Sequence, residues 1–125
     1  CAALNGFNAC LICYGQTGAG KTHTMFGSLE RGSDQQGLAF RAVSMLAELL
    51  RSRSLEAGAI SVEFSFLEVY NDELYDLLDG QKKLSRQRSS EKHVVPQGLT
   101  RRQCEADKME EQVHSWLVEG AATRT

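Results

Sequence analysis

Four residues near the start of this 125-residue chain have the types and the spacing that hold a phosphate group. Gly15, Gly20, Lys21 and Thr22 satisfy the pattern Gly-x-x-x-x-Gly-Lys-[Ser/Thr], and the mostly apolar stretch 8–14 precedes them. A polyphosphate packs negative oxygens close together, and backbone N–H groups reach them only where no Cβ intervenes. The pattern therefore predicts a phosphate-binding loop between a strand and a helix.

Each residue type in this loop has its own chemical role. The glycines permit positive φ angles, and the helix expected after the loop adds unpaired N–H groups and the positive end of its dipole. Lys21 would place a charge on the β- and γ-phosphates, and the Thr22 hydroxyl would ligate Mg²⁺, which makes these two residues the catalytic candidates. The alternative is a glycine-rich turn without a ligand, in which a lysine would oppose the helix dipole. The candidate nucleotide site comprises Gly15, Gln16, Thr17, Gly18, Ala19, Gly20, Lys21, Thr22 and His23.

The histidines and cysteines add no second site. His23 has two interpretations. Its side chain could point towards a base at the edge of the site, or it could be a surface residue of the first helical turn. Cys10 and Cys13 form a Cys-x-x-Cys pair, but an offset of three on a strand puts the sulfurs on opposite faces. We therefore expect both cysteines to be buried as small apolar residues, in a reducing compartment, cytosolic or nuclear.

Composition places the chain within one soluble globular domain. It is 42% hydrophobic and 24% charged, with 11 glycines and a single proline. No apolar run approaches the roughly 18 to 20 residues that a bilayer needs, and no secretory signal opens the chain. The first residue is not methionine, so we expect a piece of a longer protein.

The elements that position the loop alternate between strand and helix. We expect a strand buried on both faces at 8–14, a helix from Lys21 and a polar loop at 28–37. A further helix is predicted by apolar residues at helical spacing, which would form one buried face: Leu38, Ala42, Met45, Leu46 and Leu49.

The second half repeats this alternation. The stretch 59–70 is predicted to be one strand, because apolar residues alternate with polar ones over 60–66. Phe66 and Leu67 break the alternation, so we expect the far end of this strand to be covered on both faces. Asn71 is expected to cap a short helix whose Leu74, Leu77 and Leu78 face inward, and 80–93 to form a loop or hairpin. The last helix is predicted from a capping box, an apolar stripe and a stop, namely Asp107 with Glu110, then Met109, Val113, Trp116 and Leu117, then Gly120.

Charge is distributed unevenly along the chain. Residues 81–102 hold seven basic residues and one acid, whereas the other residues carry a balance of −8 within a net charge of −2. Such a patch attracts an acidic partner, unless it is an ordinary solvated loop. No aromatic residue lies among 81–102 to stack on bases, so we do not expect a nucleic acid. The basic residues are Lys82, Lys83, Arg86, Arg88, Lys92, Arg101 and Arg102.

Three blocks resemble the kinesin motor domain. "GFNACLICYGQTGAGKTHTMFG" is similar to the kinesin phosphate-loop signature, and Phe7 stands where that signature has tyrosine. "SFLEVYNDELYDLL", residues 65–78, resembles the kinesin Ser-Phe-x-Glu-Ile-Tyr-Asn-Glu segment that precedes Asp-Leu-Leu. Gly120 and Arg124 keep the Gly-x-x-x-Arg spacing found shortly before the first kinesin switch, whereas Phe40 replaces a usual proline at a helix start.

The resemblance implies an α/β fold, part of a P-loop NTPase of the kinesin motor type, with residues 1–125 as the central part of one domain truncated at both ends. It implies Mg·ATP as the ligand, microtubules as the partner, a place in the cytoplasm on the cytoskeleton, and no membrane. The loop that corresponds to Lys82, Lys83, Arg86, Arg88 and Lys92 faces the microtubule in kinesins.

Some features of the family are missing from the sequence. The two motifs with which kinesins sense the γ-phosphate do not occur within residues 1–125, so we expect these residues alone to be inactive as an ATPase. Asp72 follows an apolar stretch and resembles the metal-holding acid of a phosphate-loop enzyme, but we interpret it as part of a helix cap. Another phosphate-loop NTPase and a non-catalytic interaction module are the alternative functions.

Overall fold

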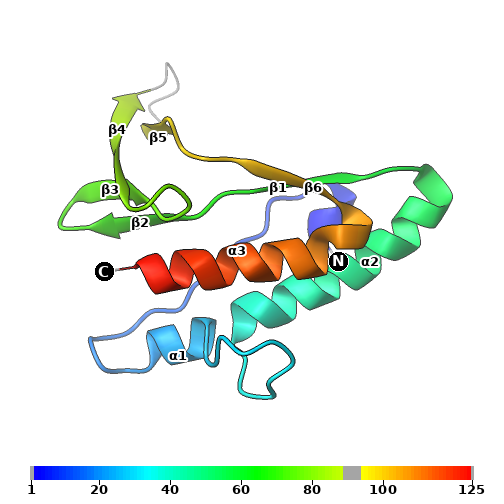
Figure 1. The fold of residues 1–125 in the computed structure, drawn as a ribbon, viewed down its shortest axis with the longest axis horizontal. Coiled ribbons are helices and arrows are strands. Elements are labelled where there is room, and N and C mark those ends of the chain that lie inside the picture. Colours follow the sequence, from blue (N-terminus) through cyan, green and yellow to red (C-terminus); the bar gives the residue numbers. More distant parts are fainter. Residues whose placement is uncertain (1, 89–93, 125) are drawn as a thin grey trace. The chain divides into compact units, whose positions relative to one another are not determined.

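The structure is a computed structural model that describes residues 2–88 and 94–124 (Figure 1). The chain divides into two compact units, Cys1–Leu38 and Ala39–Thr125, and each is described by itself. No helix within the described ranges combines the length and the apolar character needed to cross a bilayer. The elements in order are η1 Ala2–Asn5, α1 Lys21–Met25, α2 Leu38–Ala57, β1 Ser61–Phe64, β2 Leu67–Tyr70, β3 Glu73–Asp76, β4 Lys82–Arg88, β5 Val94–Gln97, β6 Arg102–Glu105, η2 Ala106–Lys108 and α3 Met109–Thr123.

The first unit contains the predicted helix but not the predicted strand. Residues 7–15 have no regular secondary structure, so the strand expected at 8–14 is wrong, and Tyr14 is 93% exposed. A strand exists only as part of a hydrogen-bonded ladder, and none of the strands that the structure describes pairs with this segment. The extended segment leads directly into the glycine loop and α1.

The loop 28–37 folds back on the end of α1. The Gly37 N–H donates to the Phe26 carbonyl oxygen at 2.7 Å, and the Ser28 N–H donates to the Gln35 carbonyl oxygen at 2.9 Å. A Cβ on Gly37 would lie 2.5 Å from the Met25 backbone, so only glycine fits at this crossing. The loop is thus confirmed, and its ends are held together by backbone hydrogen bonds.

Helix α2 begins at Leu38 as predicted, but a different edge of it is buried. Phe40 and Ala47 are 2% and 1% exposed, whereas Leu38, Met45 and Leu49 are exposed. The apolar periodicity indicates that the helix has a buried face, but tertiary contacts decide how the helix is rotated. Phe40 fits the helix without the proline common at this position, because it packs into the core.

Two contacts join α2 to α3 within the second unit. The rings of Phe40 and His114 have centroids 4.8 Å apart. One guanidinium nitrogen of Arg51 lies 3.2 Å from a carboxylate oxygen of Glu110. These contacts place the Phe40 edge of α2 against α3, which explains why the Met45 edge is left outside.

The strands form two antiparallel sheets. β1 pairs with β6 in a ribbon, and β2, β3, β4 and β5 form a four-stranded sheet in that order (Figure 1). The predicted strand over 59–70 is confirmed as extended structure, but it is divided into β1 and β2, which belong to different sheets. The loop or hairpin expected at 80–93 contains β4, which pairs with β5, whereas residues 89–93 lie outside the described residues. The far end of the predicted strand is only partly covered, since Phe66 and Leu67 are half-buried and Val69 and Tyr70 are exposed.

The short helix predicted after Asn71 is wrong. Asn71 and Asp72 have φ angles of 49° and 61°, and they link β2 to β3, where Tyr70 pairs with Glu73. Two consecutive residues with positive φ make a type I′ turn, whose twist matches that of an antiparallel hairpin. Asn71 and Asp72 therefore turn the chain, and neither is part of a helix cap.

Helix α3 supplies much of the core of the second unit and runs beside the β1–β6 ribbon (Figure 1). Its predicted stripe is confirmed: Met109, Val113 and Leu117 are buried, and the partly buried Trp116 stacks on Phe64 at a centroid distance of 5.9 Å.

Both predicted ends of α3 are wrong. The helix is preceded by a 3₁₀ turn, and Lys108 at its N-cap makes no side-chain capping bond, so the proposed box of Asp107 and Glu110 is not formed. Gly120 does not stop the helix, which continues to Thr123. A Cβ on Gly120 would lie 2.3 Å from the Phe66 ring, so this glycine makes room for an aromatic side chain.

Candidate functional site

The glycines of the candidate phosphate-binding loop have the positive φ angles that the sequence predicts. Gly15, Gly18 and Gly20 have φ angles of 153°, 83° and 90°. A Cβ on Gly18 or Gly20 would meet nothing within 4 Å, whereas one on Gly15 would lie 3.1 Å from the Ala19 Cβ. Glycine at 18 and 20 is therefore required by backbone conformation, and the space beside both residues is open.

Lys21 links the two ends of this loop. Its ammonium group donates a hydrogen bond to the Gly15 carbonyl oxygen, and the Ala19 N–H donates to the Gln16 carbonyl oxygen at 3.1 Å within the loop. Gly20 precedes α1 without a side-chain cap, so the first-turn N–H groups have no capping side chain. Backbone donors and one ammonium group thus gather on a segment of seven residues.

The residues of the first turn suit a metal that arrives with a nucleotide. Lys21, Thr22 and His23 are all exposed, and no described region groups three or more His, Cys, Asp or Glu residues as metal ligands. Mg²⁺ characteristically uses one or two protein oxygens together with phosphates and water, so a single Thr22 hydroxyl fits that donor set. Because α1 has only five residues, its dipole adds less than a long helix would, and attraction of an anion here would depend mainly on Lys21 and the loop amides.

The cysteines do not all lie where the sequence predicts. Cys10 is exposed and Cys13 is half-buried, so the expected burial of the pair is wrong for Cys10. The missing strand ladder accounts for this exposure. Cys104 is buried, and burial followed by the nearby negative charge of Asp107 raises the pKa of its thiol, which disfavours the reactive thiolate.

The β4–β5 hairpin, the second candidate site, carries less free positive charge than its sequence indicates. The Lys82 ammonium lies 3.5 Å from an Asp79 carboxylate oxygen, and the Lys83 ammonium lies 3.2 Å from a Glu73 carboxylate oxygen. Arg86 is exposed on β4. Arg88 ends β4, and Lys92 lies outside the described residues.

The two arginines after this hairpin hold the fold together. Arg101 pairs with Glu63 at 2.9 Å. Arg102 donates to both carboxylate oxygens of Glu119 at 2.6 and 2.8 Å, and to the Leu78 carbonyl oxygen at 3.0 Å. Its hydrogen bond with Glu119 raises the pKa of Arg102 and lowers that of Glu119. Arg102 therefore ties β6 to α3 rather than adding to a free basic surface.

Sequence reasoning missed a buried carboxylate next to the hairpin. Asp76 is 0% exposed, and its two carboxylate oxygens accept hydrogen bonds from the N–H groups of Leu78 at 2.9 Å and Thr100 at 2.7 Å. These bonds fasten the end of β3 to the segment before β6. The partner at Thr100 is 24 residues away, so no local pattern could indicate it.

Two of the blocks singled out in the sequence meet in space. Phe66 lies against Gly120, and a carboxylate oxygen of Glu68 lies 3.9 Å from a guanidinium nitrogen of Arg124. The Ser-Phe-x-Glu segment therefore receives the Gly-x-x-x-Arg end of α3. The spacing of each block is explained by its contacts with the other.

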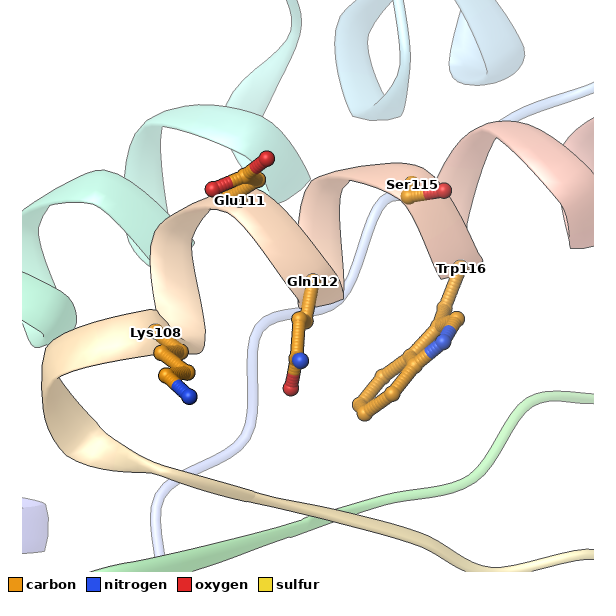
Figure 2. Close-up of a pocket in the computed structure, with 5 residues that line it drawn as sticks. All are labelled: Lys108, Glu111, Gln112, Ser115 and Trp116. Carbon is orange, nitrogen blue, oxygen red and sulfur yellow. The ribbon is translucent and has the colours of Figure 1, made fainter.

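A surface cavity of 320 Å³ lies along α3 (Figure 2). It is lined by Lys108, Glu111, Gln112, Ser115 and Trp116, and the side chains of Lys108, Gln112 and Trp116 point to the same side of the helix. None of these residues belongs to the candidate phosphate-binding loop, so this cavity is not the candidate nucleotide site.

Comparison with known proteins identifies the family of the chain. The family profile described as the kinesin motor domain matches residues 1–125. The chain is 37% identical over 122 residues to the chicken (Gallus gallus) kinesin-like protein KIF18B, covering 98% of this chain and 14% of that protein. It is 38% identical over 99 residues to the Emericella nidulans kinesin-like protein klpA, covering 79% of this chain and 12% of that protein.

A human kinesin-like protein is also similar to this chain, over a shorter stretch. The chain is 44% identical over 77 residues to the kinesin-like protein KIF13B, covering 62% of this chain and 4% of that protein. The chain thus spans a small part of the length of these relatives. With the family profile matched along its whole length, the chain belongs to the kinesin motor domain family.

Proposed function

We propose that this chain is the nucleotide-binding part of a kinesin-like microtubule motor, which in the full-length protein couples Mg·ATP binding and hydrolysis to movement. The observation that carries the proposal is the loop itself: left-handed Gly18 and Gly20, open space beside both, and the Lys21 ammonium folded onto the loop. Family membership supports the same assignment.

The chain's own residues would bind and orient the triphosphate. Loop amides between Gly15 and Lys21 donate to phosphate oxygens, and the Lys21 ammonium exchanges its Gly15 carbonyl acceptor for the β- and γ-phosphates. The Thr22 hydroxyl would hold Mg²⁺, which neutralises charge on the phosphates when bound. His23 borders the loop and would contact a base at the edge of the site. Orientation of the attacking water needs groups from the two switch motifs, which are absent from residues 1–125.

The β4–β5 hairpin would face the microtubule, an acidic surface in the cytoplasm. Arg86 and Arg88 of β4, with Lys92, would supply the main attraction, whereas Lys82 and Lys83 also interact with acids of this chain. Long-range attraction between opposite charges speeds encounter and weakens with salt.

The loop assignment is tested with Lys21→Ala in the full-length protein. Removing one charge-assisted contact to phosphate should raise the dissociation constant for Mg·ATP at least about tenfold, the equivalent of about 1.4 kcal/mol. The matched control is Lys108→Ala, which removes a lysine outside the loop. The affinity of this variant for Mg·ATP should equal that of the unmodified protein. Isothermal titration gives both values, and equal affinity for the Lys21 variant would refute the assignment.

The alternatives predict other results in the same protein. A different phosphate-loop NTPase would hydrolyse ATP at a rate that microtubules do not change. A non-catalytic interaction module would show no turnover with or without them. Phosphate release measured in the presence and absence of microtubules therefore distinguishes the motor from both.

A further inference from the structure

Ser85 on β4 is an exposed serine with basic neighbours, and the proposed motor function assigns it no role. Lys82 and Lys83 lie three and two residues before it. The side chains of Lys82 and Lys83 are 59% and 60% exposed, so both remain accessible despite their acidic partners. A serine preceded by two accessible lysines has the charge pattern that basic-selecting protein kinases recognise.

The pairing of β4 changes at this serine. Residues 82–84 pair with β3, through Leu84 opposite Leu74, and residues 85–88 pair with β5, through Ser85 opposite Gln97. Leu84 is buried and anchors the first part of the strand. From Ser85 onward the described hairpin is a two-stranded arm, and such arms are marginally stable in water. Ser85 thus lies where an anchored strand becomes an arm that can open for an enzyme.

We propose that Ser85 is a phosphorylation site for a protein kinase that selects basic residues before its target, and that the added phosphate weakens binding to microtubules. The Ser85 Oγ attacks the γ-phosphorus of ATP held by that kinase, and a new O–P bond forms. The bond from the γ-phosphorus to the bridging oxygen breaks, ADP leaves, and the hydroxyl proton passes to a base of the kinase. The regulatory half rests on the proposed function, whereas the site itself does not.

The effect on binding follows from charge. Residues 81–102 carry seven basic groups against one acid, a formal balance of +6. A phosphate adds about −1.5 to −2 charges at neutral pH. Alternation along β4 assigns Ser85 to the face of Lys83 and to the opposite face from Arg86. The phosphate would therefore weaken attraction to an acidic surface by lowering the net positive charge of the hairpin.

The site is tested in full-length protein in which Ser89→Ala and Ser90→Ala remove two other serines near arginines. The catalytic subunit of cyclic-AMP-dependent protein kinase and Mg·ATP are the probe, and mass spectrometry locates the phosphate. We expect phosphate on Ser85, none there after Ser85→Ala, and at least a tenfold lower rate after Lys82→Gln with Lys83→Gln. Ser115→Ala, which alters an exposed serine without basic residues at the same positions, should leave the rate unchanged. No phosphate on Ser85 would overturn the site.

The regulatory half is tested by microtubule cosedimentation at low salt. We expect the kinase-treated protein to bind several-fold less than the untreated protein, and the Ser85→Ala protein to be unaffected by treatment. Equal binding before and after modification would overturn the regulation alone. If the untreated protein fails to bind microtubules at all, the proposed function and the regulation both fail, while the phosphate measurement still decides the site.

Discussion

Gly120 contributes to stability because it lacks a side chain where the Phe66 ring packs. Its hypothetical Cβ lies 2.3 Å from one carbon of the Phe66 ring and 2.7 Å from another, so Gly120→Ala must displace the ring. We expect a loss of about 1–3 kcal/mol in the free energy of unfolding, because overpacking a buried site forces side chains off their preferred conformations. Urea unfolding measures this loss.

Helix propensity alone predicts the opposite result for Gly120→Ala, namely a gain in stability. In an exposed helix, replacing glycine by alanine stabilises by about 1 kcal/mol. Combining Gly120→Ala with Phe66→Leu should recover part of the stability, because the smaller side chain leaves room for the methyl group. A single Gly120→Ala variant as stable as the parent would show that the helix and the ring are not in this contact.

The Arg102–Glu119 pair makes stability depend on pH. The hydrogen bond from Arg102 holds the pKa of Glu119 below its usual 4.5, so its contribution is complete above that value and is lost as pH falls through the lower folded-state pKa. When the pH falls from about 7 to about 3.5, the free energy of unfolding should therefore decrease less in the Glu119→Gln variant than in the unmodified protein. Urea unfolding at both pH values checks this. Glu111→Gln, a change at an exposed glutamate of the same helix, is the control and should follow the parent.

Among the elements, the β2–β3 hairpin shows how two local patterns compete. Leu74, Leu77 and Leu78 have helical spacing, yet Val69 pairs with Leu74 and the chain turns at Asn71 and Asp72. Asparagine suits both a helix cap and a left-handed turn, so its presence could not decide between them. The pairing partners, which include β4 farther along the chain, favour the hairpin.

The β4–β5 hairpin carries the prediction that belongs to this scale. Changing its described basic residues to glutamate, Lys82, Lys83, Arg86 and Arg88, should strongly reduce cosedimentation of the full-length protein with microtubules at low salt. The effect should shrink as salt rises, since exposed charges are screened beyond about 8 Å at physiological ionic strength. Arg31→Glu and Arg53→Glu, changes at exposed arginines outside the hairpin, serve as the charge control. An unchanged bound fraction would favour the solvated-loop interpretation.

At the scale of the whole molecule, residues 1–125 should neither hydrolyse ATP at a useful rate nor remain monomeric when expressed alone. Leu11, Ile12, Tyr14 and Met45 are exposed apolar side chains, and exposed apolar surface favours association with other chains. The switch motifs that orient water are absent from this stretch. Light scattering gives the size, and a phosphate-release assay gives the turnover. A monomer with a cooperative melt, whose turnover is lost on Lys21→Ala, would contradict this expectation.

The sequence by itself determined the features that depend on neighbouring residues. The left-handed turns of the glycine loop could be predicted because glycines at 15, 18 and 20 permit positive φ wherever the loop is placed. The helices α2 and α3 could be predicted because their apolar residues recur within a few positions. Only the tertiary structure decided that residues 8–14 form no strand and that Phe40 rather than Met45 is buried. It also decided that Arg102 is tied to Glu119. These outcomes depend on ladders, helix rotations and ion pairs between residues distant in sequence, and such contacts form only when the chain brings their partners together.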